Sequence, residues 1–235
     1  MQGSSVRPEE IALFDDLAAR WWDPAGPMRP LHMMNPPRAA WVLERVARHF
    51  PGPVRILDVG CGAGLLSESL ARAGHEVLGL DAGAEVIAAA QAHAQGQGLT
   101  LSYRNATAEA LVAEGRKFPV ITALEVLEHV DGPGEFIATL AALLEPGGLL
   151  FVSTMDRSRK SFLVAKLGAE YLLRLLPAGT HNWRQFVTPA ELGGHCRAAG
   201  LRLCGTAGIS FAPLAGGFRI SRDTSVNYIA MAQAG

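Results

Sequence analysis

Short apolar runs alternate along the chain with longer segments that favour helices. The predicted strands are residues 54–58, 76–80, 100–104, 118–124 and 149–153. The predicted helices between them are residues 64–73, 84–95, 107–114 and 133–144. Regular alternation of strand and helix is typical of a parallel sheet with helices on both faces. The pattern therefore predicts an α/β fold built on a doubly wound, mostly parallel sheet.

The alternation changes at both ends of the chain. Residues 1–50 are predicted to form an N-terminal helical segment, with helices over 8–20 and 38–49 and a turn-rich stretch between them. Residues 156–188 form an insertion after the fifth strand. At 235 residues and 49% hydrophobic content, the chain is expected to form one domain, residues 1–235.

Beyond the insertion, a helix over 189–199 precedes two late strands near 201–207 and 226–232. These two strands would add an antiparallel hairpin to the five parallel strands. The sequence therefore predicts a seven-stranded sheet.

A glycine-rich turn follows the first predicted strand, in the sequence Ile56-Leu57-Asp58-Val59-Gly60-Cys61-Gly62-Ala63-Gly64. Glycine lets the backbone adopt φ > 0 and pass close to a ligand. The second predicted strand ends on Asp81, about 20 residues on, where an acid can accept hydrogen bonds from ribose hydroxyls. The two features together indicate a nucleoside cofactor.

The spacing of the glycines separates two cofactor classes. Dinucleotide folds use G-x-G-x-x-G to bring a helix N-terminus against a pyrophosphate, whereas this turn reads G-x-G-x-G. Asp58, just before it, would repel a diphosphate and favour the sulfonium cation of S-adenosylmethionine. The pattern resembles the first motif of S-adenosylmethionine-dependent methyltransferases. A nucleotide-dependent oxidoreductase is the alternative.

Three candidate catalytic residues, Glu125, Glu128 and His129, follow the fourth strand, at the sheet edge where doubly wound folds bind ligands. If the chain forms a helical turn here, their spacing places them on one face, where they could hold magnesium, manganese or zinc. In the alternative interpretation, Glu125 is a strand-end polar group and His129 merely lines the pocket. Leu124 would flank an adenine ring, although a buried strand end explains it equally well.

Arg38 follows Asn35-Pro36-Pro37, whose prolines stiffen the chain before it. A guanidinium that follows a rigid segment of the chain is well placed to bind a carboxylate such as that of a methionine moiety. The alternative is a solvated arginine at the start of a helix.

The insertion contains an apolar segment over 161–176 with one polar stripe, formed by Lys166, Glu170 and Arg174. Arg157, Arg159 and Lys160 add positive charge at its start. Such a helix suits a lid over an apolar substrate or a contact with an anionic membrane surface. The alternatives are a core helix and a dimer interface.

Composition narrows the possible partners and the cellular location of the protein. A net charge of −1 gives no indication of a nucleic-acid partner. Three scattered cysteines suggest reduced thiols in a cytoplasmic protein. The charged N-terminal residues argue against a secretory signal, and no apolar run reaches the ~18 residues of a spanning helix.

Several further motifs make the chain similar to the O-methyltransferases of ubiquinone biosynthesis. The motifs are Trp21-Trp22-Asp23-Pro24, Asn35-Pro36-Pro37-Arg38, Glu125-Val126-Leu127-Glu128-His129, Gly168-Ala169-Glu170-Tyr171, Gly179-Thr180-His181 and Val226-Asn227-Tyr228. The resemblance covers nearly the whole chain. Two positions depart from the family pattern, with Asp156 in place of an asparagine and Ala63 in place of a frequent glycine.

The resemblance implies an enzyme that methylates polyprenylated hydroxyphenols and quinols with S-adenosylmethionine. Its cofactor contacts would fall on Arg38, Gly60, Asp81 and Leu124, and a divalent metal, magnesium or zinc, would bind Glu125, Glu128 and His129. Its partners would be a polyprenyl phenol or quinol, an anionic membrane surface and a quinone-synthesis assembly. The implied location is cytoplasmic, at the periphery of the inner membrane.

The implied reaction requires removal of a phenolic proton, because a phenol has a pKa near ~10. A bound cation would lower the pKa of a coordinated hydroxyl, whereas His129 could act alone as a general base. The sequence leaves both routes open. A membrane-associated subunit without activity is a further alternative, against which the intact cofactor turn argues.

Overall fold

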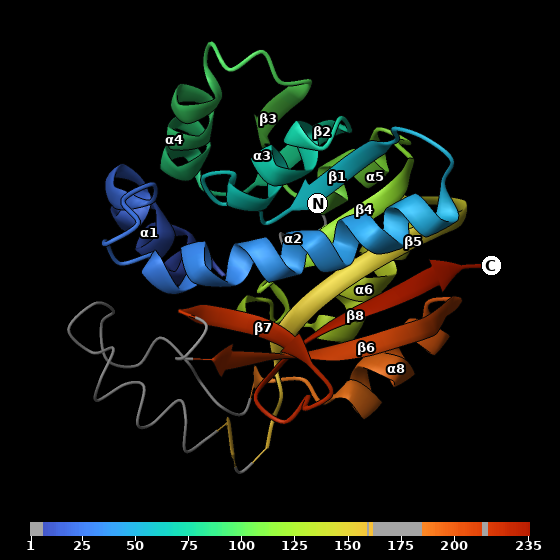
Figure 1. Cartoon of the computed structure of the whole chain (residues 1–235). Helices are drawn as coiled ribbons and strands as arrows, with labels where there is room; N and C mark the ends of the chain where they lie inside the picture. Colours follow the sequence, from blue (N-terminus) through green and yellow to red (C-terminus); the bar gives the residue numbers. More distant parts are fainter. Residues whose placement is uncertain (1–6, 159, 162–184, 213–215) are drawn as a thin grey trace.

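The computed structural model describes residues 7–158, 160–161, 185–212 and 216–235 of the chain. In this part, eight strands form one sheet in the order β3-β2-β1-β4-β5-β8-β6-β7 (Figure 1). The strands are β1 Arg55–Val59, β2 Glu76–Asp81, β3 Leu101–Asn105, β4 Phe118–Leu124, β5 Leu144–Met155, β6 Leu201–Ala212, β7 Gly217–Ser221 and β8 Asn227–Ala234. The first five pair in parallel, and β8, β6 and β7 are antiparallel. The predicted doubly wound, mostly parallel α/β sheet is confirmed.

The predicted number of seven strands is wrong for the described residues. β6 continues to Ala212, and the chain then returns as β7, which pairs Gly217–Ser221 with Gly208–Ala212. The signal for β7 is a five-residue alternation in which Phe218 and Ile220 are the apolar members. So short a run is easily assigned to a loop when its pairing partner is not known.

Nine helical segments accompany the sheet in the described residues. They are α1 Pro8–Leu17, η1 Ala18–Arg20, α2 Arg29–His49, α3 Leu65–Arg72, α4 Ala84–Ala94, α5 Ala108–Ala113, η2 Leu127–His129, α6 Pro133–Ala142 and α8 Pro189–Ala198. The turn-rich stretch predicted up to residue 37 is wrong in its second half, because α2 begins at Arg29 and runs through Pro36 and Pro37. Packing compensates for these prolines: the buried Asn35 amide donates to the Leu65 carbonyl at 2.9 Å, which fixes α2 against α3.

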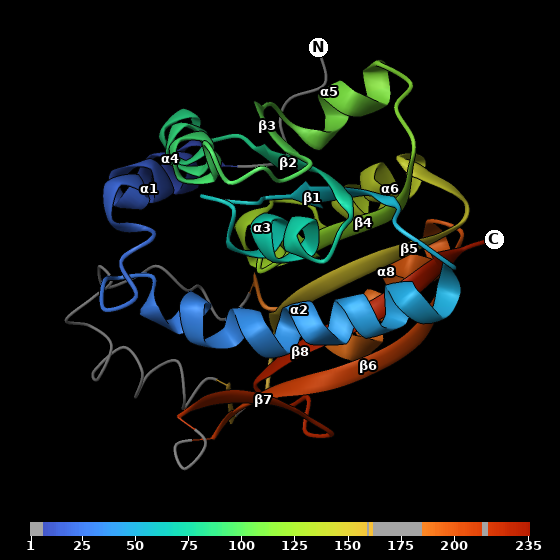
Figure 2. The same cartoon turned by 45° about the horizontal axis from the view of Figure 1, so that its top comes forward.

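Helices α2 and α3 lie on one face of the sheet and α6 and α8 on the other (Figure 2), and an apolar layer packs on each face. Leu57 of β1 and Ile121 of β4 pack on the side of α5, α6 and α8. Their neighbours Ile56 and Val120 pack on the side of α2 and α3. This period of two is what a strand buried on both faces requires.

Asp58 ties three elements together beneath the glycine turn. It is 2% exposed, and its carboxylate accepts hydrogen bonds of 2.6 Å from Ser67 of α3 and Thr122 of β4. Burial raises the pKa of Asp58 to about 6. Both carboxylate oxygens are therefore engaged with the fold, and the predicted effect of Asp58 on a cofactor stays a prediction.

The insertion predicted over 156–188 lies largely outside the described residues, including the whole 162–184 stretch and Arg159. At its start, Arg157 pairs with Glu191, and Lys160 pairs with Asp223 at 2.5 Å. Among the helices that are described, none combines the length and the apolar character needed to cross a membrane.

Asp58 gives the stability of the chain a defined pH dependence. Its folded pKa of about 6 exceeds its ordinary value of 3.8, so the unfolded chain loses the proton first as pH rises. The free energy of unfolding then falls through this window, by up to about 1.4 kcal/mol per pH unit. Asp58→Asn removes the titration, and the variant should therefore gain stability relative to the parent as pH rises from about 4 to about 6.

Urea unfolding of parent and variant across this range measures the difference. Glu76→Gln, at an exposed acid on the start of β2, is the control and should show no such drift. A stability difference between Asp58→Asn and the parent that does not change with pH would contradict the assignment.

Candidate active site

The glycine turn joins β1 to α3 as predicted. Gly60 and Gly62 have φ of 68° and 52°, in the region that favours glycine. A Cβ on Gly60 would lie 2.5 Å from a methyl group of Val126, and one on Gly62 would lie 2.3 Å from the Trp21 ring. A side chain at either position would therefore displace its neighbours as well as strain the backbone.

Asp81 lies at the end of β2, directly beside this turn. Its Oδ2 accepts a hydrogen bond of 2.9 Å from the Gly62 amide, and its Oδ1 accepts one of 2.9 Å from the Gly83 amide. Burial raises the pKa of Asp81, and these amide donors oppose the shift. Each oxygen keeps a second lone pair, which is the chemistry that a ribose diol requires.

Arg38 is buried in the middle of α2, so its interpretation as a solvated arginine is wrong. Its Nη1 lies 3.5 Å from Glu125 Oε1, and its side chain is 5% exposed. Nε and Nη1 have no hydrogen-bond acceptor within the described residues. Burial lowers the pKa of Arg38, and the charges of Glu125, Asp58 and Glu128 oppose that shift. Unsatisfied guanidinium donors in such a place fit a carboxylate ligand.

Glu125 adopts a left-handed backbone with φ of 58° at the end of β4. Its carboxylate accepts hydrogen bonds from Ser153 of β5, at 2.5 Å, and from the Asn227 amide of β8, at 2.9 Å. Sequence reasoning gave Ser153 and Asn227 no role at this carboxylate, because strands β5 and β8 are brought to Glu125 by the fold. Left-handed backbone at a residue with a side chain is strained and is often found at functional sites.

Glu128 is buried behind Glu125. Its Oε2 accepts a hydrogen bond of 2.7 Å from Thr154 of β5. Burial, followed by the negative charge of Glu125, raises the pKa of Glu128 to about 8. This shift favours the protonated form of the carboxyl group.

His129 is held by α1, which sequence reasoning had not connected to it. Its Nδ1 lies 3.0 Å from Glu10 Oε2, and both side chains are largely buried. The ring of Phe14 meets the imidazole edge-on, with 5.2 Å between ring centroids. Arg7 reaches from the start of the helix to donate to the Glu128 carbonyl at 2.9 Å.

The three predicted metal ligands lie close in the chain, but their side chains turn to different partners. Glu125 faces Arg38 and Asn227, Glu128 bonds to Thr154, and His129 pairs with α1. The described part of the chain contains no group of three or more His, Cys, Asp or Glu side chains arranged to hold a metal ion. The helical turn assumed from the spacing does not form, because Glu125 is left-handed and η2 is a 3₁₀ turn.

Leu124 ends β4 half-buried and packs against the apolar layer on the side of α2 and α3. Both interpretations of this residue remain compatible with that position. Its contact with an adenine ring stays a prediction.

Comparison with known proteins identifies the family. A model described as a methyltransferase domain matches residues 31–204. The ubiquinone biosynthesis O-methyltransferase of Methylobacterium nodulans is 47% identical, over 98% of this chain and 96% of that protein. The one from Caulobacter vibrioides is 45% identical, over 96% of this chain and 93% of that protein. The chain belongs to the ubiquinone biosynthesis O-methyltransferase family.

Solved structures support the fold alone. Magnesium protoporphyrin IX methyltransferase from Synechocystis, solved with bound S-adenosylmethionine, has a TM-score of 0.65 and 17% identity, over 99% of this chain and 100% of that one. A plantazolicin methyltransferase has a TM-score of 0.65 and 15% identity, over 97% of both chains. The predicted methyltransferase fold is confirmed.

The contact between Glu10 and His129 predicts a positioning role for α1. A carboxylate that accepts the Nδ1 proton fixes the tautomer and orientation of an imidazole. Glu10→Gln should therefore lower kcat by about 10- to 100-fold, with little change in KM for the cofactor. Steady-state kinetics measures both constants.

Glu9→Gln, at the exposed neighbouring position on α1, is the matched control and should behave as the parent. Equal kinetics for the Glu9 and Glu10 variants would show that the Glu10 contact has no role in turnover.

Proposed function

We propose that this chain transfers the methyl group of S-adenosylmethionine to an oxygen of a polyprenylated hydroxyphenol or catechol in ubiquinone biosynthesis. The observation that carries the proposal is the near full-length similarity to ubiquinone biosynthesis O-methyltransferases. The site supports it, because a glycine turn, a strand-end acid and a buried arginine surround one edge of the sheet.

The chain's own residues fit the cofactor. Asp81 would accept hydrogen bonds from the ribose hydroxyls, and Arg38 would pair its unsatisfied N–H groups with the methionine carboxylate. Gly60 would let the backbone approach the nucleoside, and Leu124 would flank the adenine ring. S-adenosylmethionine supplies a methyl group on a positively charged sulfur. The protein's contribution is to hold the substrate oxygen in line with that methyl group.

Two routes for removal of the phenolic proton are considered at this site, a general base and a cation that would lower the pKa of the hydroxyl. We favour His129 as the general base, because Glu10 fixes its ring, whereas burial favours the protonated form of Glu128. The alternative is a magnesium or zinc ion on Glu125, Glu128 and His129. Its support is electrostatic: the charge of Glu125 raises the pKa of Glu128, and a cation would relieve that repulsion.

A substrate with a polyprenyl tail partitions into a bilayer, so the enzyme must meet it at the membrane. We therefore extend the proposal to an enzyme that contacts the anionic cytoplasmic surface of the inner membrane, alone or within a quinone-synthesis assembly. The apolar sequence of the insertion and the chemistry of the substrate support this location.

The activity is tested directly with purified protein, S-adenosylmethionine and a short-chain catechol analogue. We expect a monomethyl ether and S-adenosylhomocysteine as products, and no thermal stabilisation of the protein by NAD. Asp81→Ala should weaken S-adenosylhomocysteine binding by about 1.5–3 kcal/mol, which is about ten- to a hundredfold, because two ribose hydroxyls lose their acceptor.

Isothermal titration calorimetry measures this affinity, and Glu76→Ala at the other end of β2 is the control. Unchanged S-adenosylhomocysteine binding in Asp81→Ala would contradict the assignment of Asp81 as the ribose acceptor. Stabilisation by NAD in place of S-adenosylhomocysteine would instead identify an oxidoreductase.

Treatment with a chelator distinguishes the two routes by which the phenolic proton could be removed. Because the three candidate ligands turn to different partners, we expect methyl transfer to continue in protein that elemental analysis shows to be free of metal. Loss of turnover on chelation, with recovery on adding magnesium or zinc, would establish the cation route instead. Protein dialysed without chelator is the control, because it shows how much activity is lost when protein is lost during the treatment.

A further inference from the structure

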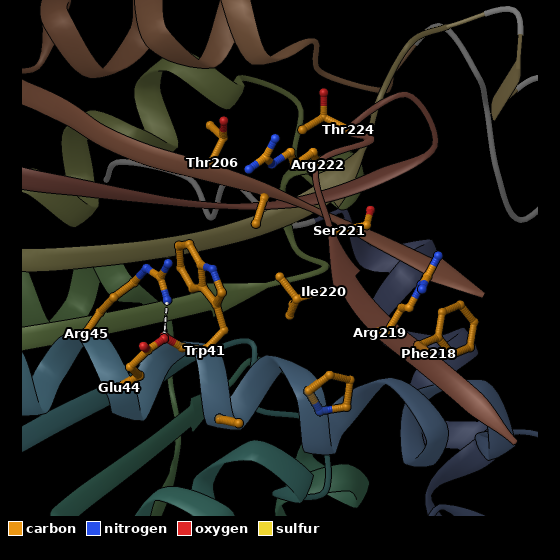
Figure 3. Close-up of a pocket in the computed structure, with 13 residues that line it drawn as sticks. Trp41, Glu44, Arg45, Thr206, Phe218, Arg219, Ile220, Ser221, Arg222 and Thr224 are labelled. Atoms are coloured by element: carbon orange, nitrogen blue, oxygen red, sulfur yellow. Dashed lines mark hydrogen bonds and ion pairs between the residues drawn. The ribbon is translucent and has the colours of Figure 1, made fainter. Parts of the chain in front are cut away.

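A groove of about 840 Å³ lies between α2 and the β6–β7 hairpin. Figure 3 shows Trp41 on its α2 side and Phe218 on its strand side. None of its lining residues belongs to the glycine turn, to the segment after Asp81 or to the Glu125–His129 segment. The contacts that hold Asp81 in place therefore lie outside this groove.

The short segment Asp81-Ala82-Gly83 joins β2 to α4 and carries the acid of the cofactor site. Within it, the Gly83 amide donates to Asp81 Oδ1 at 2.9 Å. From the end of β3, the Asn105 side-chain amide donates to the carbonyls of Asp81 and Ala82 at 3.1 and 2.8 Å. Because one carboxylate oxygen is bound within the segment, the direction of the Asp81 side chain depends on where Gly83 lies.

Helix α4, which follows this segment, has no capping side chain of its own. Its N-cap residue is Gly83, whose backbone is extended, with φ of −79° and ψ of 127°. The first amides of a helix have no partner within the helix, and a side-chain oxygen at the N-cap usually accepts hydrogen bonds from them. Glycine cannot supply that oxygen, so the acceptor has to come from elsewhere.

Asp15 of α1 supplies the missing acceptor. Its Oδ1 accepts a hydrogen bond of 3.0 Å from the Glu85 amide and one of 3.2 Å from the Val86 amide. A Cβ on Gly83 would lie 2.6 Å from the same oxygen, so any side chain there would displace Asp15. Helix α1 lies beside α4 (Figure 1 and Figure 2), and through Asp15 it caps that helix from outside.

An apolar cluster holds the N-terminal segment on α4 independently of this cap. Ala18 and Trp21, which follow α1, are buried in one cluster with Val86 and Ala90 of α4. Removal of the Asp15 carboxylate should therefore leave the two helices packed together. The expected change is confined to the start of α4 and to the segment before it.

The charge of Asp15 acts on Asp81 in the opposite sense to the cap. Burial and, as a smaller effect, this charge raise the pKa of Asp81. Loss of the charge would favour the ionised form of Asp81, which is the better acceptor for hydroxyl groups. Weaker cofactor binding in a variant at Asp15 would therefore have to come from the lost cap.

We propose that Asp15 is a positioning residue of the cofactor site, which caps α4 and thereby holds the Asp81–Gly83 segment in the form that presents Asp81 to the ribose hydroxyls. The cofactor then meets a segment that is already ordered, so that binding does not have to order it. The proposal rests on the proposed function, in which Asp81 accepts hydrogen bonds from the ribose.

Isothermal titration calorimetry of the full chain with S-adenosylhomocysteine tests this role. Asp15→Ala should weaken binding by about three- to thirtyfold, which is the range of a lost N-cap expressed as a change in affinity. Asp15→Asn keeps a side-chain oxygen that can cap α4 and should bind nearly as the parent does. Asp16→Ala, at the exposed neighbouring acid of α1, is the control and should also bind as the parent does.

An analogue of S-adenosylhomocysteine without the two ribose hydroxyls separates positioning from a general effect on the fold. The analogue offers Asp81 no hydroxyl donor, so the parent and Asp15→Ala should bind it equally, and this binding also shows that the variant is folded. Equal weakening for both ligands in Asp15→Ala would show that Asp15 only stabilises the fold, and it would overturn the proposal. So would parent-like binding of S-adenosylhomocysteine by Asp15→Ala.

Gly83→Ala answers the same question if Asp15→Ala does not fold. Its backbone φ suits alanine, and its Cβ would displace the Asp15 carboxylate without removing it. It should show the same loss for S-adenosylhomocysteine and none for the analogue, and the opposite result would overturn the proposal.

Asp81→Ala, titrated beside these variants, reports separately on the proposed function. Weaker binding of S-adenosylhomocysteine in Asp81→Ala but not in Asp15→Ala would leave the ribose assignment intact and overturn the role of Asp15. Unchanged binding in Asp81→Ala would contradict the ribose assignment itself. Any loss in Asp15→Ala could then not act through Asp81, and the positioning role would also be overturned.

Discussion

The Arg38 guanidinium is buried within the electrostatic reach of three carboxyl groups, those of Glu125, Asp58 and Glu128. Only one cation serves these three acids in the described part of the site. Taking several unbalanced carboxylates out of water is costly, and the chain reduces this cost by raising the pKa of Asp58 to about 6 and that of Glu128 to about 8. Hydroxyl donors on β4 and β5 add to this arrangement, because Thr122, Ser153 and Thr154 each donate to one of the three carboxyl groups.

The same charge balance bears on the choice of ligand. Negative charge at this edge of the sheet would favour a positively charged sulfonium over a diphosphate, and the raised pKa values of Asp58 and Glu128 weaken that preference. Asp58 was expected to act directly on the cofactor, but its two oxygens are bound by Ser67 and Thr122. An effect of Asp58 on the cofactor would therefore have to act at a distance, and it stays a prediction.

Much of this fold could be predicted because its signals are local. Short stretches of sequence are enough to predict three features: the strand before Gly60, the acid at Asp81 and the burial of β1 and β4 on both faces. The course of α2 through Pro36 and Pro37 was not predicted, because the compensating contacts come from α3. Strand β7 was not predicted, because its five residues can be recognised as a strand only from their pairing with the end of β6.

The active-site contacts were harder to predict for the same reason. Asn227 reaches Glu125 across 102 positions of sequence, and Glu10 reaches His129 across 119. Spacing along the chain suggested that Glu125, Glu128 and His129 share one face, whereas distant partners draw them apart. The motif predicted that the three residues follow β4, and tertiary contacts determine which way each side chain faces.

The N-terminal segment joins the two halves of the proposed reaction. Glu10 of α1 holds His129, while Asp15 of the same helix accepts hydrogen bonds from the Glu85 and Val86 amides at the start of α4, just after Asp81. Trp22 then donates to the Ala63 carbonyl within the glycine turn. One short stretch of chain therefore contacts both the segment that would accept the phenolic proton and the turn that would hold the cofactor. Because Glu10 and Asp15 lie on one helix, a shift of α1 would move its contacts with His129 and with the start of α4 together.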